Sequence, residues 1–150
     1  MKRSRQIVVD SSVIVKWLSS QDEKWLNQEN ELFLKEADRL LDDRRRGKII
    51  LHTLELVKYE VGNAINYKGM DETATLSVII LFYSLPIIFH QMEEELALDT
   101  GELAKKMSIT YYDASFLALA KQLKAKLVTD NPKHQKKQKD ILVTPIEKYH

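Results

Sequence analysis

Short runs of β-branched and apolar residues alternate along this chain with longer stretches of helical periodicity, and no other feature limits its fold as strongly. The runs have the length of buried strands and are too short for core helices. They occupy residues 7–9, 49–51, 86–89, 126–129 and 141–143. Strands that alternate with helices form a mostly parallel sheet covered by helices on both faces. We therefore predict an α/β protein with a three-layer α/β/α architecture and about five short strands.

Polar residues at the ends of the amphipathic stretches predict where helices begin and end. Asp71 is expected to cap a helix that ends at residue 84. Thr110 and Asp113 have the spacing of a capping box at the start of a strongly apolar helix. Thr53 is expected to cap the helix over residues 54–65, and Gly47 to end an amphipathic helix that begins near residue 22.

Length and composition describe one globular domain over residues 1–150. The chain has no cysteine, which excludes disulfide scaffolds, thiolate zinc sites and cysteine catalysis, and suits a reducing cytoplasm. A formal net charge of +1 gives no global sign of nucleic-acid binding, so any charge signal is local. The longest apolar stretch, residues 78–89, is shorter than a membrane helix, so we expect a cytoplasmic protein with no membrane contact.

Four acidic residues are predicted to gather at one edge of the sheet. Asp10 closes the first strand, Asp130 closes the fourth, and Asp113 lies in the first turn of the helix before that strand. Glu60 lies about two turns into the helix after the second strand. Ligands of such sheets bind outside the carboxyl ends of the strands, where these residues fall.

Crowded carboxylates repel one another at neutral pH, so the cluster needs a cation or protonation of some of its members. Oxygen ligands without cysteine suit Mg²⁺ or Mn²⁺, and such sites act on phosphate esters. Each residue alone also has a structural explanation. On that explanation Asp10 would cap the next helix and Asp113 would complete the capping box. Glu60 would be a solvated helix residue and Asp130 a turn residue.

Four motifs in order along the chain resemble those of PIN-domain nucleases, and of VapC-type toxins in particular. They are the segments VVDSSVI (8–14), EVGNAI (60–65), YDASFLALA (112–120) and LVTDN (127–131). The resemblance covers nearly the whole chain. It implies a PIN-like α/β/α domain that is a Mg²⁺- or Mn²⁺-dependent endoribonuclease. It also implies a homodimer and a small cognate antitoxin as partners, with RNA as the substrate.

The resemblance also assigns roles to individual residues. Asp10, Glu60 and Asp113 match the three core acids, and Thr129 matches the hydroxyl residue of the last motif. Ser11, beside Asp10, and Asn63, one turn after Glu60, are expected to support them.

The last motif departs from the family pattern, which usually reads Thr, any residue, Asp. Here Asn131 stands at the acidic position and Asp130 one residue before it. We therefore assign Asp130 as the fourth catalytic acid. Both Asp130 and Asn131 are kept as candidate metal ligands, because the motif leaves open which of the two faces the metal.

Positive charge is concentrated near the carboxyl end of the chain. Residues 121–148 contain eight lysines against three acidic residues. Those that follow Asp130 are predicted to track the RNA backbone, namely Lys133, Lys136, Lys137 and Lys139. A solvated lysine-rich surface is the alternative. Lys2, Arg3 and Arg5 either extend this patch or belong to a disordered basic terminus.

Three functions of different classes follow from these patterns. The first is a divalent-metal-dependent endoribonuclease, the toxin of a VapBC-type pair. The second is a non-catalytic PIN-like RNA-binding module whose fourth acidic position has decayed to Asn131. The third is a phosphatase-like Mg²⁺ enzyme for small molecules, which is disfavoured because Ser12 stands where an Asp-x-Asp pair would place its second acid.

Overall fold

The computed structural model describes residues 3–19, 34–130, 141 and 143–150. Five strands form one sheet in the order β3-β2-β1-β4-β5, and all of its pairings are parallel. The strands are β1 (Arg5–Val9), β2 (Ile49–Leu54), β3 (Ile87–His90), β4 (Lys126–Thr129) and β5 (Val143–Pro145). The predicted α/β/α fold with a parallel sheet is therefore confirmed.

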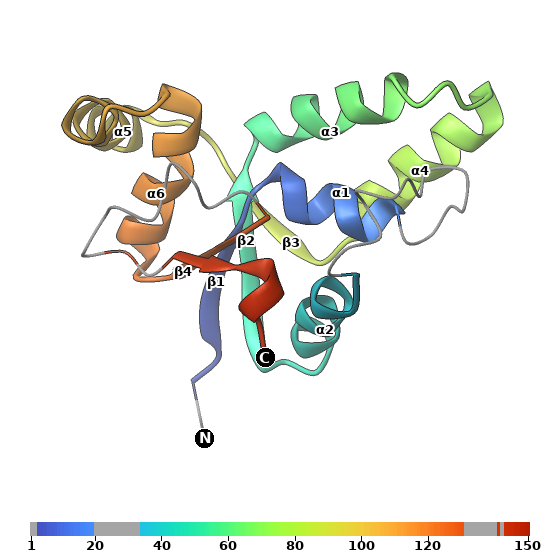
Figure 1. Ribbon diagram of the computed structural model, residues 1–150, viewed down its shortest axis with the longest axis horizontal. Coiled ribbons are helices and arrows are strands. Elements are labelled where there is room, and N and C mark those ends of the chain that lie inside the picture. Colours follow the sequence, from blue (N-terminus) through green and yellow to red (C-terminus); the bar gives the residue numbers. More distant parts are fainter. Residues whose placement is uncertain (1–2, 20–33, 131–140, 142) are drawn as a thin grey trace.

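The helices form two layers, one on each face of the sheet. Figure 1 shows α5 and α6 on one side and the other α-helices on the opposite side. The first layer consists of α5 (Glu94–Met107) and α6 (Tyr111–Leu123), which pack on each other. The second consists of α1 (Ser11–Ser19), α2 (Leu34–Arg45), α3 (Leu56–Asn66) and α4 (Glu72–Ser84). A short 3₁₀ helix, η2 (Ile146–Lys148), follows β5.

The central strand explains why short apolar runs were visible in the sequence. Ile7, Val8 and Val9 of β1 are completely buried, because helices cover both faces of a parallel sheet. The buried part of a strand in that position is apolar and shows no alternation of polar and apolar residues.

Most predicted helix ends are found where the local signals indicated. Asp71 caps α4 by accepting a hydrogen bond from the Ala74 amide at 2.8 Å, and Thr110 caps α6 by accepting one from the Asp113 amide at 3.1 Å. Gly47 follows α2 with a φ of +73°, a conformation that glycine adopts without steric cost. The part of the predicted second helix before residue 34 lies outside the described residues.

Two predictions about boundaries are wrong. Thr53 does not cap α3, because β2 continues through Leu54 and the Thr53 hydroxyl donates to the Val9 carbonyl at 2.6 Å. The last strand is Val143–Pro145 and not residues 141–143, because it pairs with β4 from Leu127 to Thr129. In both cases a contact with a neighbouring strand sets the boundary.

The strand order reverses beside β1, because the chain builds β2 and β3 on one side of it and later places β4 on the other. Parallel sheets bind ligands in the crevice outside the carboxyl ends of the strands at such a point. In the described part of the chain, no helix is long and apolar enough to cross a membrane.

Candidate functional site

Asp10 lies at the point of reversal, directly after β1, and hydroxyl groups hold both of its carboxylate oxygens. The Thr129 hydroxyl, at the end of β4, donates to Oδ2, and the Ser12 hydroxyl donates to Oδ1. The amide of Ser12 also donates to Oδ1 at 3.2 Å, so Asp10 caps α1 as well. The structural and functional explanations of Asp10 are therefore compatible.

Burial raises the pKa of Asp10, and the hydrogen bonds from Ser12, Thr129 and the Val13 amide oppose that rise. Hydrogen bonds to a carboxylate favour its charged form, whereas loss of water disfavours it. The hydroxyls therefore orient Asp10 and also help to keep it ionised.

Glu60 projects from α3 toward the same edge and is the least satisfied acid of the site. Its Oε1 atom is buried and has no hydrogen-bond partner among the described residues. Burial raises the pKa of Glu60, the charges of Asp10 and Asp113 raise it further, and a hydrogen bond from Ser11 opposes the rise. The fold therefore holds Glu60 within electrostatic reach of two other carboxylates.

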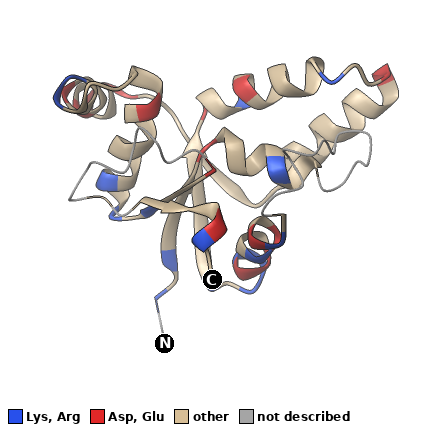
Figure 2. Ribbon diagram, in the orientation of Figure 1, with Lys and Arg blue, Asp and Glu red and all other residues tan. Residues whose placement is uncertain are grey.

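Asp113 is the third acid of this group and lies in the first turn of α6, half-buried. Figure 2 shows acidic segments at the end of β1, on α3 and at the start of α6 around this edge of the sheet. Asn63, predicted as a supporting residue, is exposed one turn after Glu60. Ser11, predicted in the same role, contacts Glu60.

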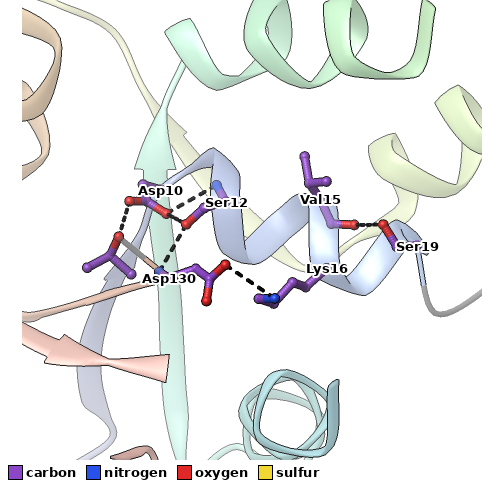
Figure 3. Close-up of polar contacts among 7 residues, drawn as sticks. Asp10, Ser12, Val15, Lys16, Ser19 and Asp130 are labelled. Carbon is purple, nitrogen blue, oxygen red and sulfur yellow. Dashed lines mark hydrogen bonds and ion pairs between the residues drawn. The ribbon is translucent and has the colours of Figure 1, made fainter. Parts of the chain in front are cut away.

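The backbone of Asp130 lies beside Asp10 and Ser12, but its carboxylate forms an ion pair with Lys16. Lys16 Nζ lies 3.2 Å from Asp130 Oδ2, and the Lys16 side chain is only 2% exposed. The Asp130 amide donates to the Ser12 hydroxyl at 3.0 Å. Figure 3 shows the Asp130 carboxylate turned along α1 toward Lys16 and away from Asp10.

Lys16 and Ser12 are polar residues of the site to which our sequence analysis gave no role in it. Lys16 interrupts the apolar segment Val13–Leu18, and a charge at a buried helical position nearly always has a partner. The lysine within this apolar segment was therefore the signal in the sequence that could have indicated a buried ion pair. The partner itself was not predictable, because it lies 114 residues further along the chain.

The site offers oxygen donors only, which suits a hard cation such as Mg²⁺ or Mn²⁺. The buried, unpaired Oε1 of Glu60 between two carboxylates is what such a cation would satisfy. Across the described ranges, however, no three acidic or histidine side chains approach closely enough to enclose an ion. The donors at this edge therefore fit a divalent cation in their chemistry.

Several predicted residues lie outside the described part of the chain. These are Asn131, the alternative fourth ligand, and the predicted RNA-binding residues Lys133, Lys136, Lys137 and Lys139.

Two tyrosines beside Asp113 are described: Tyr111 is 45% exposed and Tyr112 is 61% exposed. Both side chains are therefore accessible from solvent.

Comparison with known proteins identifies the family to which these motifs belong. The family model described as "PIN domain" matches residues 7–140. Ribonuclease VapC3 from Pyrobaculum aerophilum is 34% identical over 85 residues, which are 53% of this chain and 64% of that protein. The match therefore spans slightly less than two thirds of the relative's length.

Solved structures resemble the fold over nearly its whole length. A DNA-bound VapBC from Salmonella typhimurium matches with a TM-score of 0.67 and 13% identity, over 95% of this chain and 98% of that chain. A toxin-antitoxin complex from Klebsiella pneumoniae matches with a TM-score of 0.64 and 13% identity, over 91% and 95% of the two chains. At these identities the likeness shows the fold, and it confirms the architecture expected from the motifs.

Proposed function

This chain belongs to the PIN domain family, and from that premise we propose that it is a divalent-metal-dependent endoribonuclease that hydrolyses RNA phosphodiester bonds. The reaction takes place at the acidic edge, with Asp10, Glu60 and Asp113 as the catalytic acids. The family match and the ribonuclease relative support the class of reaction.

The observation that carries the proposal is the state of Glu60. A buried carboxylate oxygen without a hydrogen bond costs roughly 1–3 kcal/mol, and two nearby carboxylates add repulsion. Proteins retain such an arrangement where it serves a function, most simply where a cation completes it.

Asp10, Glu60 and Asp113 would hold Mg²⁺ or Mn²⁺. When bound, the cation supplies positive charge that neutralises the phosphate and makes water more acidic. The side chains of this protein orient the site. The Thr129 and Ser12 hydroxyls fix the Asp10 carboxylate, and the Ser11 hydroxyl holds Glu60.

We assign Asp130 a positioning role and no direct contact with the cation, because its carboxylate is paired with Lys16. The ion pair and the hydrogen bond from the Asp130 amide to Ser12 tie the end of β4 to α1. Asn131 then remains as the candidate oxygen ligand of the last motif.

The proposed biological role is that of a VapC-type toxin restrained by a small antitoxin, acting as a homodimer in the cytoplasm. The relative named as a ribonuclease VapC3 supports the toxin class. The likeness to a chain of a solved toxin-antitoxin complex supports a protein partner.

Cleavage of end-labelled single-stranded RNA with Mn²⁺ tests the proposed activity. The wild type and an Asp113→Asn variant are purified identically, because contaminating ribonucleases would otherwise give the same signal. We expect cutting by the wild type alone, stopped by a chelator. Equal cutting by both proteins would contradict the proposal.

The Lys16–Asp130 ion pair also favours a second candidate, a non-catalytic RNA-binding module. Lys16 pairs with Asp130, the acid that was expected to complete the acidic cluster. A nuclease site that has lost its metal would have such a neutralised acid. Calorimetry with Mn²⁺ separates the two candidates, since saturable binding that is lost in Asp113→Asn supports the nuclease and no heat supports the binding module.

A further inference from the structure

A hollow of about 620 Å³ lies at the edge of the sheet opposite the acidic site. The start of β1, the start of β4 and the carboxyl end of α6 line it. In a parallel sheet all strands begin at the same edge, so this hollow and the acidic residues lie at opposite ends of β1 and β4.

Five of the lining residues are cations, and no acidic residue lines the hollow. They are Arg3, Arg5, Lys121, Lys124 and Lys126, and we call them the basic pocket. Figure 2 shows blue segments at the carboxyl end of α6, in β4 and at the start of β1, with no red between them. In the described ranges none of the five forms an ion pair, although the charge of Arg5 also acts on Asp43.

Helix electrostatics explain only part of this cluster. Lys121 and Lys124 lie at the carboxyl end of α6, where cations interact favourably with the helix dipole. Arg3 precedes β1, and Arg5 and Lys126 begin strands, where no such dipole acts. Like charges brought together from three segments repel, so their convergence indicates an anionic ligand.

The spacing between the basic pocket and the acidic site suits one extended ligand. Arg5 and Asp10 are five residues apart along β1, or about 16 Å at the strand rise. Asp113 and Lys124 are eleven residues apart along α6, which is again about 16 Å at the helix rise. A stacked RNA strand spans a straight separation of that size with about five phosphates, and a path over the surface around the buried β1 takes more.

We propose that the basic pocket is a second RNA-binding site, which holds the phosphodiester backbone several nucleotides away from the bond that is cut. This inference rests on the proposed nuclease function for the identity of the anion. The pocket contacts phosphates and reads no bases, so it adds affinity and a minimum substrate length but no sequence preference.

The lining favours RNA over an acidic protein segment. Protein interfaces gain most of their affinity from buried aromatic and apolar anchors, whereas this lining contains no aromatic residue. Four of its cations are exposed side chains, Arg3, Arg5, Lys121 and Lys124, which suit a flexible phosphate backbone.

Binding of RNA of about twenty nucleotides, measured with a chelator present at several salt concentrations, tests the inference without any need for cleavage. The pocket variant is Arg3→Gln with Lys121→Gln, two exposed residues from different segments. We expect roughly tenfold weaker binding at low salt. Loss of two phosphate contacts should also reduce the slope of log affinity against log salt by about 1.4.

The matched control is Lys35→Gln with Arg39→Gln, which removes the same charge from exposed positions on α2, on the other face of the sheet. It should bind the RNA as the wild type does. A second pocket variant, Lys124→Asn, guards against a folding defect, because asparagine tolerates the left-handed conformation of this residue.

Equal loss of affinity in the pocket and control variants would overturn the inference, as would unchanged binding by the pocket variants. Binding of polyglutamate to the pocket as tightly as RNA would also overturn it, by assigning the site to acidic protein segments.

With Mn²⁺, the wild type and pocket variants should cut an RNA of about four nucleotides equally, since it is too short to reach the pocket. Pocket-dependent binding without any cleavage would refute the nuclease function and leave the second site standing.

Discussion

The ammonium group of Lys16 lies 3.2 Å from Asp130 Oδ2 and joins α1 to the end of β4 across the point where the strand order reverses. The two partners differ in exposure. Lys16 is 2% exposed and the Asp130 side chain is 32% exposed. The ion pair therefore stabilises a buried cation more than it stabilises the carboxylate.

This asymmetry predicts unequal effects of removing each partner. Asp130→Asn leaves the buried ammonium without this carboxylate and should lower the free energy of unfolding by about 3 kcal/mol. Lys16→Met keeps an apolar stem in the core and leaves a partly hydrated carboxylate, so it should cost about 1 kcal/mol. Urea unfolding measures both.

Glu55→Gln is the control, because it breaks the more exposed pair between Lys58 and Glu55 and should cost less than about 1 kcal/mol. A larger loss for Lys16→Met than for Asp130→Asn would show that the ion pair does not act in this way.

Glu60→Gln should make the metal-free protein more stable by about 1 kcal/mol, because it removes a carboxylate that is buried and repelled. The pKa of Glu60 is raised, so the folded state binds the proton more tightly than the unfolded state does. Wild-type stability therefore falls as the pH rises above the usual pKa of a glutamate and through the raised pKa of Glu60, and the variant lacks this fall.

Urea unfolding in a chelator, at acidic and neutral pH, measures this change. The same proteins unfolded with Mn²⁺ should reverse in order, since only the wild type gains stability from the cation. Glu102→Gln, on the exposed surface of α5, is the charge-matched control. Stabilisation of Glu60→Gln by Mn²⁺ equal to that of the wild type would argue against Glu60 as a ligand.

Thr129→Val should reduce Mn²⁺-dependent RNA cleavage by about 10- to 100-fold, because the hydroxyl that orients Asp10 is lost while the side-chain volume is kept. Thr129→Ser restores the hydroxyl and should recover most of the rate. Both variants are compared with the wild type in cleavage and in Mn²⁺ titration. Equal activity of the valine and serine variants would show that the hydroxyl does not position Asp10.

The contact between buried His52 and half-buried His90 should make the fold sensitive to acid. His52 lies 2.6 Å from Gln6 Oε1 through Nε2 and 2.9 Å from His90 Nε2 through Nδ1. When His52 is neutral, its Nε2–H donates a hydrogen bond to the Gln6 oxygen and its Nδ1 accepts one from the Nε2–H of His90. Burial and the charge of His90 lower the pKa of His52 to about 4.

The unfolded state therefore takes up a proton at higher pH than the folded state does, and stability is lost as the pH falls from 6.5 toward 4. Between pH 7 and pH 5 the loss from His52 should be about 2 kcal/mol, with a contribution of the same sign from His90, whose pKa is also lowered by burial. His52→Gln should flatten this dependence in urea unfolding, whereas the exposed control His150→Gln should leave it unchanged.

The elements that sequence analysis predicted well are those defined by neighbours in the chain. Asp71 and Thr110 cap helices through amides three residues away, and these contacts do not depend on the rest of the fold. Thr53 shows the limit. Its type and position suit a helix cap, but the carbonyl that it contacts belongs to Val9, 44 residues earlier, so strand pairing determines its role.

The order of motifs along the chain determined the family and the parallel sheet. It also placed three acids at one edge, because Asp10 follows the first strand, Glu60 lies on the helix after the second strand and Asp113 lies in the first turn of its helix. Only the tertiary structure decided that Asp130 forms an ion pair and that Glu60 keeps a carboxylate oxygen without a hydrogen-bond partner among the described residues. The insertion of β4 beside β1 brings Asp130 to Lys16. It also places Lys121, Lys124 and Lys126 at the edge of the sheet opposite Asp10 and Asp130, because a strand carries its two ends to opposite edges. Periodicity and capping act over a few residues, whereas these contacts depend on strand order, which local sequence does not encode.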